Sequence, residues 1–199
     1  MDDTTVETSA HGVYSASIKS ESARKNIMAE IRIRAATTQD LPRLTEIYNY
    51  YVVHTPITFD LTPYTVEERA AWLNQFALTG RHRLLVAEEN NIVIGYAGTS
   101  QFRAKAAYDT TVEATIYCAP EAVGKRIGRM LFVSLFQAIA QEDIHRIIGG
   151  FTIPNAGSAS LLEKFGFQPV GIFHETGRKF DRYWDVAFME RPLRLPDAK

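Results

Sequence analysis

Apolar and polar residues alternate with two different periods along the chain, and the change of period predicts helices and strands. The run IRIRAA at residues 31–36 alternates as an edge strand does, and helical spacing follows at Leu41, Leu44, Ile47 and Tyr51. A capping-box sequence at residues 65–68 opens a second helical pattern that ends before Gly80. The first part of the chain is therefore predicted to form one strand and two helices.

Strand patterns dominate the middle of the chain. RLLVAEE and IVIGYAGT are joined by an Asn-Asn turn, and TTVEATIYC alternates between two faces. A helical face at residues 127–138, the strand RIIGGFTI, a short helix at 158–165 and strands at 167–173 and 181–189 follow. The order β-α-α-β-β-β-α-β-α-β-β predicts an α/β fold on a mixed, mostly antiparallel sheet with helices on both faces.

Composition sets the class of protein and its domain organisation. Of 199 residues, 46% are hydrophobic, which is enough for a core. Residues 1–29 lack sustained periodicity, so we expect a flexible tail, one domain at 30–193 and a C-terminal tail at 194–199. The formal net charge of -1 gives no reason to expect nucleic acid or a membrane surface as partner.

The single cysteine and the N-terminus bear on compartment and metal binding. Cys118 alone excludes an internal disulfide and a multi-cysteine metal site, and the five histidines show no ligand spacing, so we expect no metal. No apolar run approaches the roughly 20 residues of a membrane helix, and no signal-peptide pattern opens the chain. We therefore expect a cytoplasmic protein.

The stretch EAVGKRIGRM at residues 121–130 lies between a strand ending at Cys118 and a helix expected from about Gly124. Free backbone N–H groups and the helix dipole would meet there, as in phosphate sites. Lys125, Arg126 and Arg129 oppose the dipole by roughly 0.3–1 kcal/mol each, which favours a bound anion. The alternative is an ordinary helix with a basic first turn.

Two polar residues near strands are further candidates. Glu113 lies within an apolar strand, where desolvation would raise its pKa and suit it to act as a base; otherwise it faces solvent. Asn155, with Ser158 three residues on, follows a strand and either contacts a ligand or caps the next helix. We interpret Cys118 as a small buried residue rather than a nucleophile.

Together these segments resemble the GCN5-related N-acetyltransferase (GNAT) superfamily, and within it the phosphinothricin and methionine sulfoximine acetyltransferases. The resemblance covers about residues 31–193, in IRAATTQDLPRLTEIYNYYV, AYDTTVEATIY, PNAGSASLLEKFGF and GRKFDRYWDVAFMERPL. It implies a sheet splayed open at its middle, acetyl-CoA as co-substrate, a small amino acid or analogue as amine acceptor, and a homodimer.

The resemblance also implies roles for residues. Glu113 would be the base and Tyr117 the proton donor to the CoA thiolate, with direct transfer and strand N–H groups near Cys118 holding the oxyanion. The backbone at 117–119 would pair with pantetheine, and the N–H groups at 123–129 would bind pyrophosphate. The implied cofactor contacts are Cys118, Ala119, Val123, Gly124, Lys125, Arg126, Ile127, Gly128, Arg129, Asn155 and Ser158. The implied amine-pocket residues are Phe59, Arg103, Lys105 and Tyr108.

The sequence departs from the family pattern at three positions. Val123 replaces a polar residue, Arg126 replaces the inner glycine of the loop, and Leu162 stands where a histidine often lies. We expect Arg126 to adopt negative φ in a helical turn, with its guanidinium near a phosphate. The alternative hypotheses are a non-catalytic or weakly active acyl-CoA-binding homologue with a degenerate loop, and an acetyltransferase of protein amines.

Overall fold

The computed structural model describes residues 31–194. The strands are β1 (Ile31–Ala35), β2 (Leu84–Glu89), β3 (Ile92–Gln101), β4 (Thr111–Cys118), β5 (Arg146–Ile153), β6 (Gln168–Lys179) and β7 (Arg182–Pro192). The helices are α2 (Leu41–His54), α3 (Val66–Leu73), α4 (Ile127–Ile139) and α5 (Ala156–Lys164), with short 3₁₀ turns η1 (Thr38–Asp40), η2 (Ala106–Tyr108) and η3 (Pro120–Ala122). This order is the one predicted, whereas the expected N-terminal tail and all but the first residue of the C-terminal tail lie outside the described residues.

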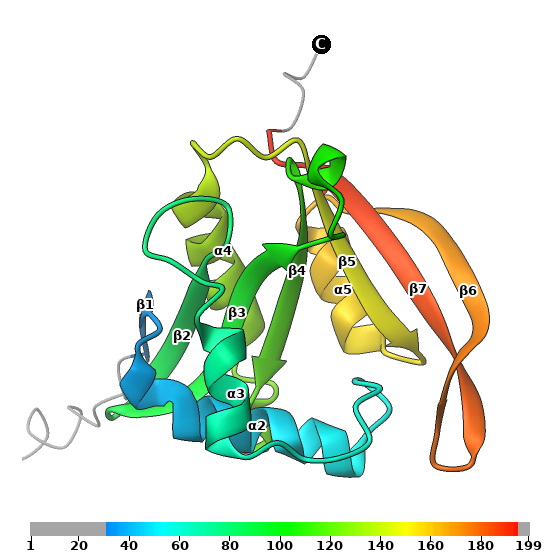
Figure 1. Cartoon of the computed structure of the whole chain (residues 1–199), viewed down its shortest axis with the longest axis horizontal. Coiled ribbons are helices and arrows are strands. Elements are labelled where there is room, and N and C mark those ends of the chain that lie inside the picture. The colour runs from blue at the N-terminus through cyan, green and yellow to red at the C-terminus, as the bar shows by residue number, and fades with distance from the viewer. Residues whose placement is uncertain (1–30, 195–199) are drawn as a thin grey trace, which may run out of the picture. The chain divides into compact units, whose positions relative to one another are not determined.

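The strands form one mixed sheet in the order β1-β2-β3-β4-β5-β7-β6. Every neighbouring pair is antiparallel except β4 and β5, which are parallel and pair only through residues 111–113 and 146–148. Beyond these three pairs the two strands separate (Figure 1). The predicted mixed, splayed sheet is confirmed.

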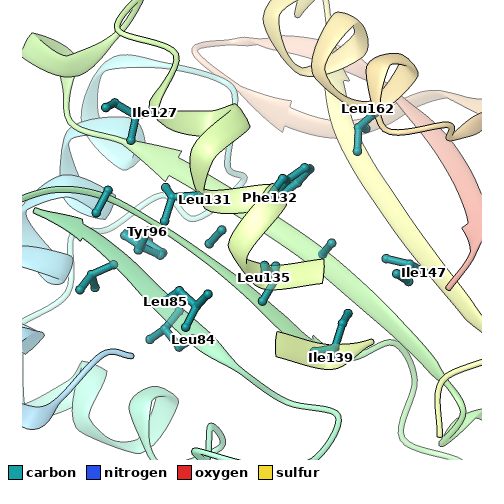
Figure 2. Close-up of a cluster of buried hydrophobic side chains, with 14 of the residues drawn as sticks. Leu84, Leu85, Tyr96, Ile127, Leu131, Phe132, Leu135, Ile139, Ile147 and Leu162 are labelled. Atoms are coloured by element: carbon teal, nitrogen blue, oxygen red, sulfur yellow. The ribbon is translucent and has the colours of Figure 1, made fainter. Parts of the chain in front are cut away.

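Helices cover both faces of the sheet (Figure 1). Helix α4 packs on β2, β3 and β4 through Ile127, Leu131, Leu135 and Ile139, which recur at helical spacing and are all buried. Figure 2 shows these side chains on the face of the sheet that also carries Leu85 of β2, with Ile147 and Leu162 extending the cluster towards β5 and α5. On the opposite face, α2 and α3 pack on each other and α2 contacts β3 and β4.

The β6–β7 hairpin differs from the rest of the sheet because it projects as a twisted arm (Figure 1). Within β6 only Gly177 and Lys179 are buried. Val170, Ile172 and Phe173 are exposed apolar residues of the same strand. Strand β6 therefore gains little of its order from the core.

An ionic cluster fixes the start of the fold. The guanidinium of Arg34 donates to both carboxylate oxygens of Asp40, at 2.7 Å each, and to Glu88 Oε2 at 2.7 Å. The Asp40 carboxylate also accepts from the backbone N–H of Thr37 at 2.7 Å. Burial alone would raise the pKa of Asp40, but the bonds from Arg34 and Thr37 outweigh it and hold that pKa below its usual value.

Asp40→Asn is expected to lower the free energy of unfolding by about 3 kcal/mol at pH 7, because it removes the two charged hydrogen bonds of a largely buried ion pair and leaves Arg34 with Glu88 alone. The folded-state pKa of Asp40 is depressed, so its contribution is present above the unfolded pKa of about 4 and is lost as the pH falls through the folded pKa. Urea unfolding of both proteins at decreasing pH should show the difference between them shrinking.

Asp143→Asn is the matched control, because the Asp143 ion pair with Arg81 is exposed. It should cost less than about 1 kcal/mol. Equal losses in the two variants would contradict a special role for the Asp40 cluster.

Candidate functional site

The candidate site lies where β4 and β5 separate. Glu113 and Ile148 form the last pair of the two strands, and Gly149 and Gly150 follow. A Cβ added at Gly149 would lie 2.9 Å from both methyl carbons of Leu162. A Cβ added at Gly150 would lie 3.6 Å from Glu113 Oε1. One glycine therefore lets α5 approach the sheet, and the other keeps space free in front of Glu113.

Beyond this fork, β4 has an edge that no strand covers. The Ala119 N–H donates to Ile94 O of β3 at 2.8 Å. Since alternate residues of an antiparallel strand face the same neighbour, Tyr117 also pairs with β3, whereas Ile116 and Cys118 direct their N–H and C=O groups into the fork. Of the backbone expected to pair with pantetheine, only Cys118 presents its polar groups there, and Tyr51 Oη donates to its carbonyl at 2.5 Å.

Two cavities follow the free edge of β4. A narrow cavity of about 60 Å³ lies in the fork, between Ala114 to Tyr117 on one side and Gly149, Gly150 and Phe151 on the other. An open cavity of about 620 Å³ lies at the start of α4 and is lined on its far side by Gly157, Ser160 and Lys164. Leu161 lines both cavities, so they adjoin along α5.

The backbone conformation of Arg126 overturns one expectation. Arg126 has φ 63° and ψ 17°, in the left-handed region, and it is the N-cap residue of α4. The helix begins at Ile127, three residues later than expected. Gly124, at φ 88°, and Arg126 flank Lys125, and together they turn the chain from η3 into α4. The expected helical turn with negative φ at Arg126 is therefore wrong. Arg126 therefore carries strain of about 1–3 kcal/mol that a glycine would avoid.

The same turn presents free N–H groups at the larger cavity. The N–H groups of Val123, Lys125 and Arg129 donate to carbonyls within the loop. Those of Gly124, Arg126, Ile127 and Gly128 have no backbone partner among the described residues. Consecutive free N–H groups at a helix N-terminus fit an anion such as a diphosphate.

Cationic side chains at this loop have different partners. Lys125 Nζ pairs with Glu89 Oε2 at 2.9 Å, so part of its charge is already balanced. Arg126, Arg129 and Lys164 line the open cavity. The expected anion site is therefore formed by backbone groups together with these three side chains.

Glu113 is half-buried and lies on the face of β4 that α2 and α3 cover. Burial raises its pKa, and no cation lies within 4 Å of its carboxylate among the described residues. A carboxylate with a raised pKa beside an open space is suited to accept a proton.

Tyr117 lies on the same face, in a cluster of tyrosine rings. Its ring centroid lies 5.1 Å from that of Tyr48, 5.3 Å from that of Tyr51 and 5.5 Å from that of Tyr96. Burial raises its pKa. Since four residues of a strand span about 13 Å, Tyr117 and Glu113 face the fork at different depths.

Arg69 is a buried residue behind this cluster that the sequence did not suggest. Its Cζ lies 4.2 Å from the ring centroid of Tyr48 and 3.9 Å from that of Trp72. Its Nε and Nη2 atoms have no hydrogen-bond partner among the described residues. The aromatic faces compensate its charge. An arginine in a short amphipathic helix is ordinarily solvated, so the pattern gave no signal for it.

The remaining candidates near the fork have structural partners. The Asn155 Oδ1 accepts from the Ser158 N–H at 3.0 Å and caps α5, while both residues line the narrow cavity. Burial raises the pKa of the Cys118 thiol to about 11, so the thiol is protonated at neutral pH. Leu162 is buried against Gly149.

The four expected amine-pocket residues do not form one cluster. Phe59 lies in the loop after α2, whose Pro56 carbonyl accepts from Thr152 near the end of β5. Arg103, Lys105 and Tyr108 lie in the connection that precedes β4, with the Arg103 Cζ 5.7 Å from the Tyr108 ring centroid. Because β4 and β5 run parallel, these two groups lie towards opposite ends of the sheet.

Two general features of residues 31–194 complete the description of the site. No group of three or more His, Cys, Asp or Glu side chains that could hold a metal ion is found there. In the same residues, no helix has both the length and the apolar character needed to cross a membrane.

Arg126→Gly is expected to raise the free energy of unfolding by about 1 kcal/mol, because glycine adopts positive φ without strain. Thermal unfolding measures this change. Arg129→Gly is the matched control, since Arg129 lies in the right-handed first turns of α4, where glycine should cost about 1 kcal/mol. Destabilisation by both substitutions would mean that Arg126 makes a contact that outweighs its strain.

Comparison with known proteins identifies the family. The acetyltransferase (GNAT) domain model matches residues 33–188. A phosphinothricin N-acetyltransferase of Streptomyces coelicolor is 52% identical over 83% of this chain and 98% of its own length. An L-methionine sulfoximine/L-methionine sulfone acetyltransferase of Salmonella typhimurium is 34% identical over 83% of this chain and 98% of its own length.

A solved structure supports the same assignment. The GNAT superfamily phosphinothricin acetyltransferase from Sinorhizobium meliloti, in complex with AcCoA, superposes with a TM-score of 0.76 at 35% identity, over 81% of this chain and 88% of that one. The expected resemblance is confirmed. The chain belongs to the GNAT acetyltransferase family, and it is an N-acetyltransferase.

Proposed function

We propose that this enzyme transfers the acetyl group of acetyl-CoA to the primary amine of a small amino acid or analogue, in one direct step with Glu113 as base. The observation that carries the proposal is the fork between β4 and β5. It places a half-buried carboxylate with a raised pKa at its closed end, and free N–H groups at the start of α4 beyond its open end. These are the two sites that a ternary complex requires.

Acetyl-CoA fits the residues that line the two cavities. The free N–H groups of Gly124, Arg126, Ile127 and Gly128 would hold the diphosphate, with Arg129 and Lys164 beside it. The pantetheine amides would pair with the uncovered edge of β4, in the place that a neighbouring strand would take. The Asn155 amide nitrogen and Ser158 hydroxyl lie along the same path. Bound there, acetyl-CoA supplies an activated acyl carbon.

The proposed chemistry needs a base, an oxyanion donor and an acid. Glu113 accepts a proton from the ammonium, and the free amine forms a C–N bond to the thioester carbon. The N–H of Cys118, directed into the fork, stabilises the oxyanion. The C–S bond then breaks, and Tyr117 donates a proton to the thiolate. The second proton that the nitrogen loses on becoming an amide returns to the tyrosinate. Leu162 cannot transfer protons in place of a histidine.

A water molecule links Glu113 to the ammonium in this proposal. The amine nitrogen and the sulfur are bonded to one carbon in the transition state, whereas Glu113 and Tyr117 lie about 13 Å apart along β4. When the Tyr117 hydroxyl contacts the sulfur, a gap remains between the amine nitrogen and the Glu113 carboxylate. One water molecule would bridge this gap.

Phe59 and the group of Arg103, Lys105 and Tyr108 are two separate candidate positions for binding the amine substrate, since they lie towards opposite ends of the sheet. Phe59 lies on the side of the fork where β5 ends, and Arg103 and Lys105 offer cations that suit an α-carboxylate. The names of the relatives from Streptomyces and Salmonella indicate amino-acid analogues as acceptors. We also propose a homodimer, supported by the exposed apolar residues of β6, and a cytoplasmic location.

The non-catalytic alternative has less support. It was motivated by Arg126 and Leu162, and the strained conformation of Arg126 is a local cost. The free N–H groups beside Arg126 are nevertheless present, and the relatives that cover the same length of chain are named as acetyltransferases.

Glu113→Gln is expected to reduce kcat/KM for L-methionine sulfoximine at pH 7 by about 100-fold or more, because the amide cannot accept a proton. Since burial raises the pKa of Glu113, wild-type activity should fall as the pH drops through that raised pKa, and the variant should lack this dependence. Steady-state kinetics with thiol detection of released CoA measures both. Glu67→Gln on the exposed face of α3 should retain wild-type kinetics. A wild-type kcat/KM in Glu113→Gln would refute the assignment of the base.

Gly150→Ala is expected to reduce kcat/KM for the amine about tenfold, because the added methyl group enters the space before Glu113 and lies 3.0 Å from Phe188 Cε1. Affinity for acetyl-CoA, measured by calorimetric titration, should fall less than kcat/KM for the amine, since Gly150 lines the narrow cavity but is remote from the α4 loop that would hold the diphosphate. Gly171→Ala is the matched control, because nothing lies within 4 Å of its Cβ position. Equal effects of the two substitutions would exclude crowding at the site.

A further inference from the structure

The outer end of β6 has an unusual pattern of burial. Ten of its twelve residues are exposed, and the two buried ones are Gly177 and Lys179. A lysine is seldom buried without a charged partner, and no carboxylate lies within 4 Å of its Nζ among residues 31–194. Lys179 and Gly177 therefore require a specific explanation.

Both residues lie against the loop that carries Phe59. Lys179 Nζ donates to Thr58 O at 2.8 Å, which is the carbonyl of the peptide that joins Thr58 to Phe59. A Cβ added at Gly177 would lie 2.1 Å from Phe59 Cε2, so only glycine lets the ring occupy this place. The backbone and the side chain of Phe59 are thus both fixed by β6.

The loop is held from two other directions. Tyr48 Oη of α2 lies 2.7 Å from Thr58 Oγ1 and donates to Asp60 Oδ2 at 2.6 Å. Thr152 Oγ1 of β5 donates to Pro56 O at 2.7 Å. The residues on either side of Phe59 therefore have a fixed place, and the hairpin supplies the contact nearest to the ring.

The hairpin turn directs Lys179 inward. Lys179 pairs with Arg182 across a two-residue turn in which Phe180 has φ 52° and Asp181 has φ 55°, as a type I′ turn requires. Trp184 Nε1 donates to the Lys179 carbonyl at 2.9 Å, and Arg182 Cζ lies 3.8 Å from the Trp184 ring centroid. The sequence GRKFDRYW thus forms one unit that presents Gly177 and Lys179 to the loop.

We propose that Lys179 and Gly177 are positioning residues that hold Phe59 at the amine site, so that the outer end of the β6–β7 hairpin determines which amines the enzyme accepts. This inference rests on the proposed role of Phe59 in amine binding. Lys179 contacts neither the free edge of β4 nor the α4 loop, so acetyl-CoA binding does not depend on it.

Lys179→Met tests the backbone contact. It keeps the length of the side chain and removes the donor to Thr58 O, so KM for L-methionine sulfoximine should rise about tenfold, while KM for acetyl-CoA stays within about twofold. Lys179→Arg, which restores an N–H donor, should recover part of the loss. Arg178→Met is the matched control, because Arg178 is the adjacent exposed cation of β6 and should leave both KM values unchanged.

Gly177→Ala tests the ring contact independently and applies even if Lys179→Met fails to fold. Its methyl group displaces the Phe59 ring and should raise KM for the amine alone, whereas Gly171→Ala of the same strand should not. The proposal is overturned if both β6 variants keep the wild-type KM for the amine. It is also overturned if KM for both substrates rises in the same proportion, which would indicate a general loss of structure.

Phe59→Ala separates this proposal from the proposed function. If Phe59→Ala raises KM for the amine and the β6 variants do not, the positioning role alone is wrong. If Phe59→Ala leaves KM unchanged, Phe59 does not bind the amine, and both assignments of this loop are wrong.

Discussion

The separation of β4 from β5 is the constraint on which the rest of the structure depends. Three residue pairs join the strands, and beyond Glu113 the backbone edge of β4 has no strand to pair with. The free N–H and C=O groups of such an edge need other hydrogen-bond partners. The Tyr51 hydroxyl does so at the Cys118 carbonyl, and the proposed binding of acetyl-CoA would do so at the remaining groups. The same separation creates the fork in which the candidate acid and base lie.

Glycines determine what can approach this fork. Gly149 admits Leu162 of α5 on one face, Gly150 leaves space before Glu113 on the other, and Gly177 admits Phe59 beneath the hairpin. At Arg126 the opposite holds, because a side chain occupies a left-handed position that glycine would adopt without strain. The loop still presents its free N–H groups, so the departure of Arg126 from the family pattern does not remove the candidate anion site. In the proposed function, backbone geometry rather than residue identity would bind the diphosphate here.

The buried and half-buried charges of this fold are compensated in two different ways. Arg34, Asp40 and Glu88 form a compensated cluster that stabilises the start of the domain. Arg69 and Lys179 are buried without carboxylate partners within 4 Å among the described residues, and aromatic faces or a carbonyl meet them instead. Arg69 contacts the ring of Tyr48, which bonds to Thr58 and Asp60, and Lys179 bonds to the Thr58 carbonyl, so both cations help to position the loop that carries Phe59.

The sequence by itself determined the order of the elements, because the hydrophobic period is a local property of each segment. The helical period at residues 41–51 and 127–138 and the alternation at 111–118 all correspond to elements of the structure. It also determined the family, through the motifs around Glu113 and Trp184. Only the tertiary structure decided the conformation of Arg126, the exclusion of Ala119 from the free edge, the separation of Phe59 from Arg103, and the burial of Arg69 and Lys179. Most of these depend on which strand, helix or loop lies opposite a residue, and the period of a local pattern does not specify contacts between segments that are distant in the chain, such as the one between Lys179 and Thr58.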